Sequence, residues 1–274
     1  VQERLRLKRD RGAKPQAAEL FTLAIELGDP SADPHAHLVR VTPPVADQRE
    51  RLRTLVEEHP SGLAYGLLAA HYAYVEPRVW DTALELIERS VAADPRDPQS
   101  LAAAGNLYVG WLQAHRSTAP EKLARAEALL EGALELAPED PLVLERFAYG
   151  WRILGEQFPA QAGGVGPEAL ARYTRARELM LSTLGRYPGC FGARKELVDC
   201  VRHLEGPAQA LVALAPLLEL YPQEGELHYI RYKFLGELRR YDEALQAIEA
   251  AARLEPERAD FNELARRFRA QLGR

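Results

Sequence analysis

The sequence predicts an all-α solenoid built from helical hairpins. Prolines close runs of the pattern Ala-x3-Leu/Ile-x2-small, and Pro188, Pro222 and Pro256 lie 34 residues apart. The same series begins, at wider spacing, with Pro60, Pro95 and Pro138. Between the prolines, apolar side chains recur at the three- and four-residue intervals of amphipathic helices. A period near 34 residues indicates a repeat protein, in which each hairpin buries its apolar face against its neighbours.

The N-terminal part, residues 1–62, is predicted to form divergent helices ahead of the regular repeats. Residues 1–14 are polar and basic, as in a frayed end, and residues 15–27 carry the apolar stripe of a first firm helix. Four prolines in the next stretch leave room for a short helix near 34–41. A helical pattern returns over 45–58 and stops before a proline.

Five repeats and a capping helix follow. Their predicted bounds are 64–97, 98–140, 141–190, 191–224, 225–258 and, for the cap, 259–272. The second and third repeats contain insertions around 113–121 and 155–168, because the closing prolines there are 43 and 50 residues apart. Small residues should let the two helices of a hairpin approach closely; they are Ala83, Ala126, Ala210 and Ala244. The cap is apolar on one side and rich in Arg and Glu on the other, as expected at the end of a stack.

Composition narrows the class of protein. The 274-residue chain is 47% hydrophobic and 27% charged with a net charge of −5, which is ordinary for a folded globular protein. Basic residues are dispersed beyond the N-terminal tail, so we expect no nucleic-acid partner. No apolar stretch approaches the roughly 20 residues of a membrane span. Five of the 35 basic residues are lysines, a bias typical of a high-GC bacterial genome.

The repeat pattern resembles that of the tetratricopeptide repeat family. The segment Tyr241-Asp242-Glu243-Ala244-Leu245, continued by Ala251 and Pro256, is the best match, and Asp81-Thr82-Ala83-Leu84 with Asp94-Pro95 is the next. The resemblance covers roughly residues 64–272. It implies a right-handed superhelix whose first helices line a concave groove for peptides or proteins. It implies neither a cofactor nor enzymatic activity.

The family register also names residues that should face the groove. They are Tyr72, Asn106, Tyr149, Arg152, Lys195, Arg202, His203, Tyr229 and Lys233. One hypothesis is an anionic anchor, in which Arg152, Lys195, Arg202 and Lys233 hold a carboxylate or acidic side chain. The alternative is a solvated face with local salt bridges, such as Lys195 with Asp199 one helical turn later.

Other chemistry-bearing patterns are weak. His35 and His37 form one close pair without acidic or thiol partners nearby, so we expect no metal site. The glycine-rich run 163–167 lacks the Lys-Ser/Thr pair of a phosphate loop and is predicted to connect two helices. Phe158 next to it is either an exposed contact or folded back on its own repeat. Cys190 and Cys200 flank one predicted helix and are expected to be buried and unbridged.

The sequence therefore predicts a scaffold that binds a protein or peptide in its groove, not an enzyme. A second interpretation is a periplasmic accessory component of a solute transporter, with a small ligand or a transporter subunit as its partner. Self-association into a homodimer is a third. We expect a cytoplasmic location, or a periplasmic one if a signal segment was removed before Val1.

Overall fold

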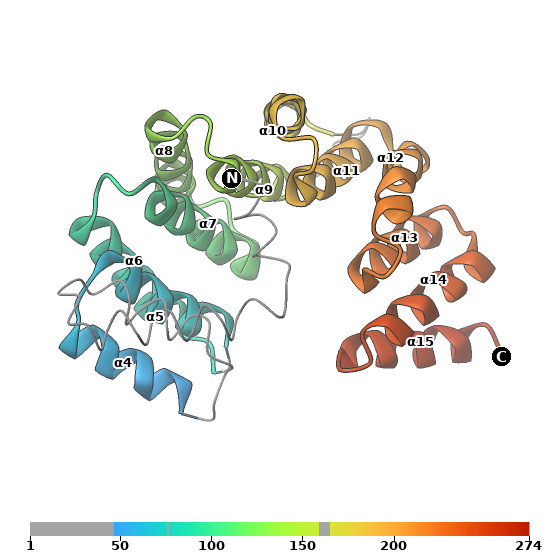
Figure 1. The fold of residues 1–274 in the computed structure, drawn as a ribbon, viewed down its shortest axis with the longest axis horizontal. Helices are drawn as coiled ribbons and strands as arrows, with labels where there is room; N and C mark the ends of the chain where they lie inside the picture. Colours follow the sequence, from blue (N-terminus) through green and yellow to red (C-terminus); the bar gives the residue numbers. More distant parts are fainter. Residues whose placement is uncertain (1–46, 76, 159–164, 274) are drawn as a thin grey trace.

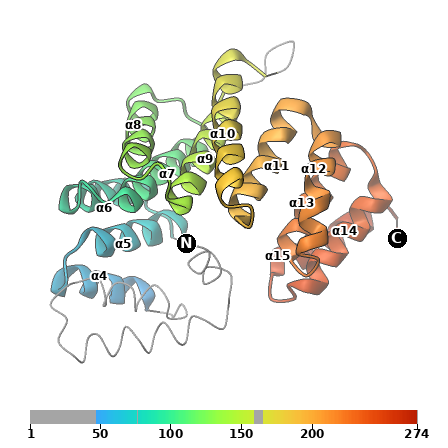
Figure 2. The ribbon, with the colours of Figure 1, turned by 45° about the horizontal axis from the view of Figure 1, so that its top comes forward.

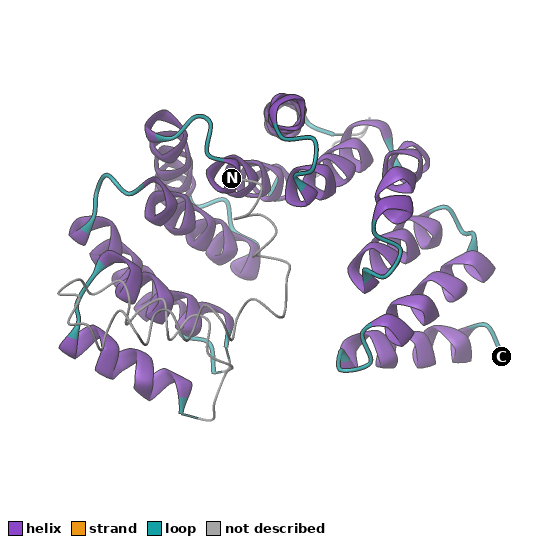
Figure 3. Ribbon diagram, in the orientation of Figure 1, coloured by secondary structure: helices purple, strands orange, loops and turns teal. Residues whose placement is uncertain are grey.

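The computed structural model describes residues 47–75, 77–158 and 165–273, and this part of the chain is helical without strands (Figure 3). Its helices are α4 (Gln48–Glu58), α5 (Gly62–Tyr74), α6 (Trp80–Ala93), α7 (Pro98–His115), α8 (Pro120–Leu136), α9 (Pro141–Glu156), α10 (Pro167–Arg186), α11 (Phe191–Glu205), α12 (Pro207–Leu220), α13 (Gly225–Glu237), α14 (Tyr241–Leu254) and α15 (Ala259–Gln271). The segments expected at 1–14, 15–27 and 34–41 lie outside the described residues.

The helices pair into hairpins in chain order. Helix α5 packs on α6, α7 on α8, α9 on α10, α11 on α12 and α13 on α14, while α4 and α15 cover the two ends. The alanines predicted at the hairpin contacts are fully buried; they are Ala83, Ala126, Ala210 and Ala244. A missing side chain beyond Cβ at these points lets the paired helices lie close together.

Proline and its neighbours set the helix starts. Pro98 and Pro141 occupy the first turns of α7 and α9, where the missing N–H costs no hydrogen bond. The preceding aspartates cap these helices: Asp97 accepts from the Ser100 amide at 2.8 Å and Asp140 from the Leu142 amide at 2.8 Å. Each cap satisfies amides that the helix itself leaves unpaired. The Asp-Pro pair is therefore the local signal that begins an inner helix in these two repeats.

The hairpins stack into an open arch (Figure 1). Helices α5, α7, α9, α11, α13 and α15 follow its inner side, and α8, α10, α12 and α14 follow its outer side (Figures 1 and 2). One contiguous core runs from α4 to α9, with Phe147 and Leu112 among its fully buried side chains. Smaller apolar clusters continue it through α10 to α15.

The additional residues of the second repeat lengthen its helices. Helix α7 has 18 residues and α8 has 17, against 13 and 14 in α13 and α14. In the third repeat α10 reaches 20 residues. Phe158 folds back on this repeat, because the Arg172 guanidinium of α10 lies 4.4 Å from its ring centroid.

Candidate site on the inner face of the arch

Two exposed tyrosines mark the inner face of the N-terminal half. Tyr74 at the end of α5 is 53% exposed, and Tyr149 on α9 is 37% exposed. The Tyr74 hydroxyl lies against α7, where a β-carbon added to Gly110 would be 2.6 Å away from it. Burial of this hydroxyl end, helped by Tyr149, raises the pKa of Tyr74 to about 12. Glycine at position 110 therefore lets the Tyr74 ring lie across α7 toward α9.

Aromatic packing supports Tyr74 from behind. Its ring meets Trp80 edge-on at 5.6 Å between centroids, and Trp80 meets His115 at 6.2 Å. His115 stacks on Trp111 at 4.2 Å. These contacts fix Tyr74 with little remaining rotamer freedom, so it offers contact area at a low entropy cost. We name Tyr74 and Tyr149 together the tyrosine surface.

A buried polar network lies farther along the inner face, between α9 and α11. The Arg152 guanidinium donates to Glu196 at 2.9 Å and to Glu156 at 2.7 Å, and Asp199 lies 4.0 Å away. Glu196 is 4% exposed and Arg152 is 8% exposed. Desolvation opposes the charge of Arg152, but the three carboxylates outweigh it and raise its pKa. Arg152 is thus a structural cation rather than an available anchor.

His203 extends this network to the third repeat. Its Nε2 lies 3.0 Å from a Glu156 carboxylate oxygen, and its ring stacks on Tyr173 of α10 at 4.2 Å between centroids. Burial alone would raise the pKa of Glu156. The hydrogen bond with His203 and the charge of Arg152 outweigh that effect and lower it. Three helices, α9, α10 and α11, thereby share one set of polar contacts.

The remaining predicted cations also have partners. Lys195 donates to Glu226 of α13 at 3.0 Å, and Arg202 lies 3.0 Å from Glu237 of the same helix. The local pair expected between Lys195 and Asp199 gives way to these contacts between successive repeats. Of the four cations in the anionic-anchor hypothesis, Lys233 alone has no carboxylate partner within the described ranges. Its ammonium lies 5.3 Å from the centroid of the Tyr229 ring.

Two predicted groove residues lie within the packing between helices. Tyr72 is 7% exposed, and its hydroxyl accepts a hydrogen bond from Arg53 of α4 at 2.7 Å, so it offers no open surface. Asn106 sits between α7 and α9, where its amide donates to the Arg146 carbonyl at 3.1 Å. The register places both on inner helices, but α4 covers the first and α9 the second.

The expected accessory features fit this picture. Cys190 and Cys200 are buried free thiols, and burial raises the pKa of Cys200 to about 12. His35, His37 and most of the glycine-rich run lie outside the described residues. No group of metal-ligating side chains is found in the part of the chain that the structure describes. None of the helices in those ranges is both long and apolar enough to cross a membrane.

Sequence reasoning missed Tyr74 as a surface residue and Glu196 as the main partner of Arg152. The pattern puts Tyr74 in the apolar stripe of its helix, because it does not reveal that α7 lacks a side chain at Gly110. Glu196 lies 44 residues after Arg152 in sequence. Its pairing depends on the stacking of α11 against α9, which a single-repeat pattern does not encode.

The stacked hairpins and their inner face define the class: a helical-repeat solenoid. The sequence matches no family model and no curated protein. Solved structures do match. A tetratricopeptide repeat protein from Parabacteroides merdae has a TM-score of 0.61 at 13% identity, over 97% of this chain and 96% of that one. A thermophilic tetratricopeptide repeat protein of Thermus thermophilus gives 0.60 at 16% identity, over 76% of this chain and 98% of that one. The chain therefore has the tetratricopeptide-repeat fold.

Proposed function

We propose that this protein is a scaffold that binds a segment of a protein partner along the inner face of its arch. The observation that carries the proposal is the tyrosine surface: two exposed aromatic side chains on the inner helices α5 and α9, one of them held by Trp80. Aromatic side chains with a polar tip dominate binding energy at protein interfaces.

The chemistry of the inner face favours a partner segment with apolar side chains over an acidic one. Three of the four cations expected to hold an anion are paired with carboxylates, and Arg152 is buried. An incoming carboxylate would have to displace an existing partner and lie near Glu156, Glu226 and Glu237. Displacing a partner from Arg152 would also leave Glu196 buried and uncompensated, at considerable cost.

The other interpretations gain less support. No observation favours a small-ligand component of a solute transporter. Nothing in the inner-face geometry assembles a nucleophile with a base, so we infer binding rather than catalysis. Self-association is one outcome of the test below.

Site-specific photocrosslinking tests the proposal. p-Benzoylphenylalanine placed at position 74 or 149 of the full chain should capture the same partner from extracts of the native cells. Matched control positions are 181 and 212, because Leu181 and Val212 are exposed apolar residues on the outer helices α10 and α12. Mass spectrometry identifies each product. We expect the partner at the two inner positions and not at the two outer ones.

Affinity measurements complete the test. With the captured partner purified, Tyr74→Ser and Tyr149→Ser should each weaken binding about 10- to 30-fold, the range of an interface anchor worth about 1.4–2 kcal/mol. Leu181→Ser and Val212→Ser should leave the Kd unchanged. Equal capture at inner and outer positions, or full affinity in both tyrosine variants, would refute the inner-face proposal. Capture of a second copy of this chain would replace a foreign partner with self-association.

A further inference from the structure

The last two helices repeat the preceding two in register. Helices α14 and α15 begin and end 34 residues after α12 and α13. In the earlier copy, α13 presents Tyr232 and Leu235 to α14, which packs on them with Ala244 and Ala247. Leu235 is 1% exposed as a result. This side of α13 is therefore a docking face for the next outer helix.

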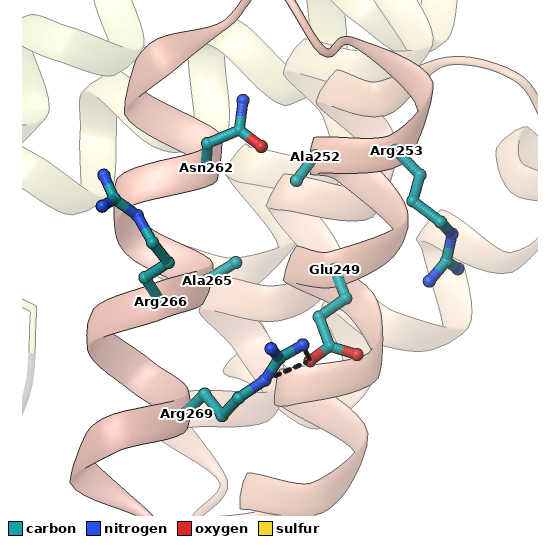
Figure 4. A pocket seen from close by; sticks show the side chains of 7 residues that line it. All are labelled: Glu249, Ala252, Arg253, Asn262, Ala265, Arg266 and Arg269. Atoms are coloured by element: carbon teal, nitrogen blue, oxygen red, sulfur yellow. Dashed lines mark hydrogen bonds and ion pairs between the residues drawn. The ribbon is translucent and has the colours of Figure 1, made fainter. Parts of the chain in front are cut away.

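Helix α15 carries arginines at the corresponding positions. Arg266 and Arg269 lie 34 residues after Tyr232 and Leu235. They line a shallow cleft of about 340 Å³ between α14 and α15, together with Glu249, Ala252, Arg253, Asn262 and Ala265. In Figure 4 the side chains of Ala252 and Ala265 point toward each other across the cleft, and the Glu249–Arg269 pair closes one end. Within the described residues, no helix occupies the place that α14 takes in the preceding repeat.

The lining of this cleft is basic. It contains Arg253, Arg266 and Arg269 against one acid, Glu249. Arg269 pairs with Glu249 at 2.5 Å, and Arg266 with Glu263 at 2.5 Å. The two arginine side chains are 54% and 75% exposed, and exposed pairs of this kind contribute about 0–1 kcal/mol, so they rearrange at little cost. Arg253 has no carboxylate partner in the described part of the chain.

We propose that this cleft docks an acidic α-helical segment of a partner protein, at the position that a further outer helix would occupy. The alanines at 252 and 265 give a floor on which a helix can lie closely, as Ala244 and Ala247 allow in the preceding repeat. A purely apolar helix would bury the arginines without partners, which is unfavourable. A helix with carboxylates at its edges would pair with Arg253 and Arg266 instead. This surface is separate from the tyrosine surface, and either proposal can fail alone.

A designed helical peptide probes the cleft. The probe is a fluorescein-labelled amphipathic peptide of about 16 residues, with an alanine stripe flanked by glutamates, and its matched control has glutamine at every glutamate. Fluorescence anisotropy is read with the full chain at 50 and 300 mM NaCl. The glutamate peptide should bind at least tenfold more tightly than the glutamine peptide at the lower salt, and the difference should shrink at the higher salt, because exposed charges are screened.

Variants locate the binding. Combined Arg253→Gln, Arg266→Gln and Arg269→Gln should weaken the glutamate peptide at least tenfold. Matched replacement of exposed arginines in other repeats, Arg89, Arg96 and Arg186, should not. Ala252→Trp keeps every charge but fills the floor, and should also abolish binding. Circular dichroism checks that each variant keeps its helicity.

Several results would overturn the proposal. They are equal affinity for the two peptides, unchanged binding by the triple cleft variant, or equal loss in the control triple. Full binding by Ala252→Trp would reduce the effect to general attraction by the arginines. A wild-type dimer in sedimentation that becomes a monomer in the cleft variant would assign the cleft to a second copy of this chain.

Discussion

Replacing Arg152 with methionine should destabilise the protein more than any exposed charge change. Its guanidinium lies within 4.0 Å of three carboxylates, and its nearby partner Glu196 is 4% exposed. Without Arg152, Glu196 remains as a buried charge with no strong compensation, a loss of about 3–5 kcal/mol. With a urea dependence of about 3 kcal/mol per molar, the unfolding midpoint should fall by roughly 1 to 2 M. Circular dichroism at 222 nm during urea titration measures this.

Two comparison variants make the reasoning refutable. Arg186→Met removes an exposed pair with Glu139, with side chains 50% and 70% exposed, and should cost less than about 1 kcal/mol. Arg152→Met combined with Glu196→Met removes both charges and should recover most of the lost stability, because a buried pair replaced by apolar groups is often near neutral. A loss below about 1 kcal/mol in the single variant, or no recovery in the double one, would show that Glu196 is not held at this cost.

The pH dependence of the same variant has a definite sign. Burial raises the pKa of Glu196, and Arg152 works against that rise. Removing Arg152 should raise the folded-state pKa further above the unfolded value of about 4.3. The folded state then binds the proton more tightly, so stability is retained at low pH and lost as the pH rises through the folded pKa. The penalty of Arg152→Met should therefore be larger at pH 8 than at pH 5.

Two further predictions concern packing and reactivity. Gly110→Ala places a β-carbon 2.6 Å from the Tyr74 hydroxyl and should displace that ring, so the Tyr74 resonance in ¹³C-tyrosine NMR should titrate nearer pH 10 than pH 12, whereas an unchanged titration would mean that the ring stays in place. Cys190 and Cys200 are buried, and the pKa of Cys200 is raised to about 12, so neither thiol should react with Ellman's reagent at pH 8 until urea unfolds the chain; rapid native labelling would contradict their burial.

The proline series predicted the fold because it is a local signal repeated along the chain. A proline that closes a helix acts within a few residues, and the 34-residue offset between α12–α13 and α14–α15 makes each position readable from its copy. The same register correctly placed Tyr149 on an exposed inner surface. It could not reveal that Arg152 would be neutralised, because two of its partners come from α11, in another repeat. Nor could it show that α4 would bury Tyr72.

The ion pairs on the inner face also affect how the arch can move. Successive inner helices from α5 to α11 pack directly on one another, whereas α11 and α13 are bridged by Lys195–Glu226 and Arg202–Glu237. Partly exposed pairs of this kind are weak and screened by salt, so they hold this joint less firmly than buried apolar packing holds the others. The tyrosine surface lies before the joint and the basic cleft after it. A partner that engaged both would therefore select the spacing of the two halves at the α11–α13 contact, where changing it costs least.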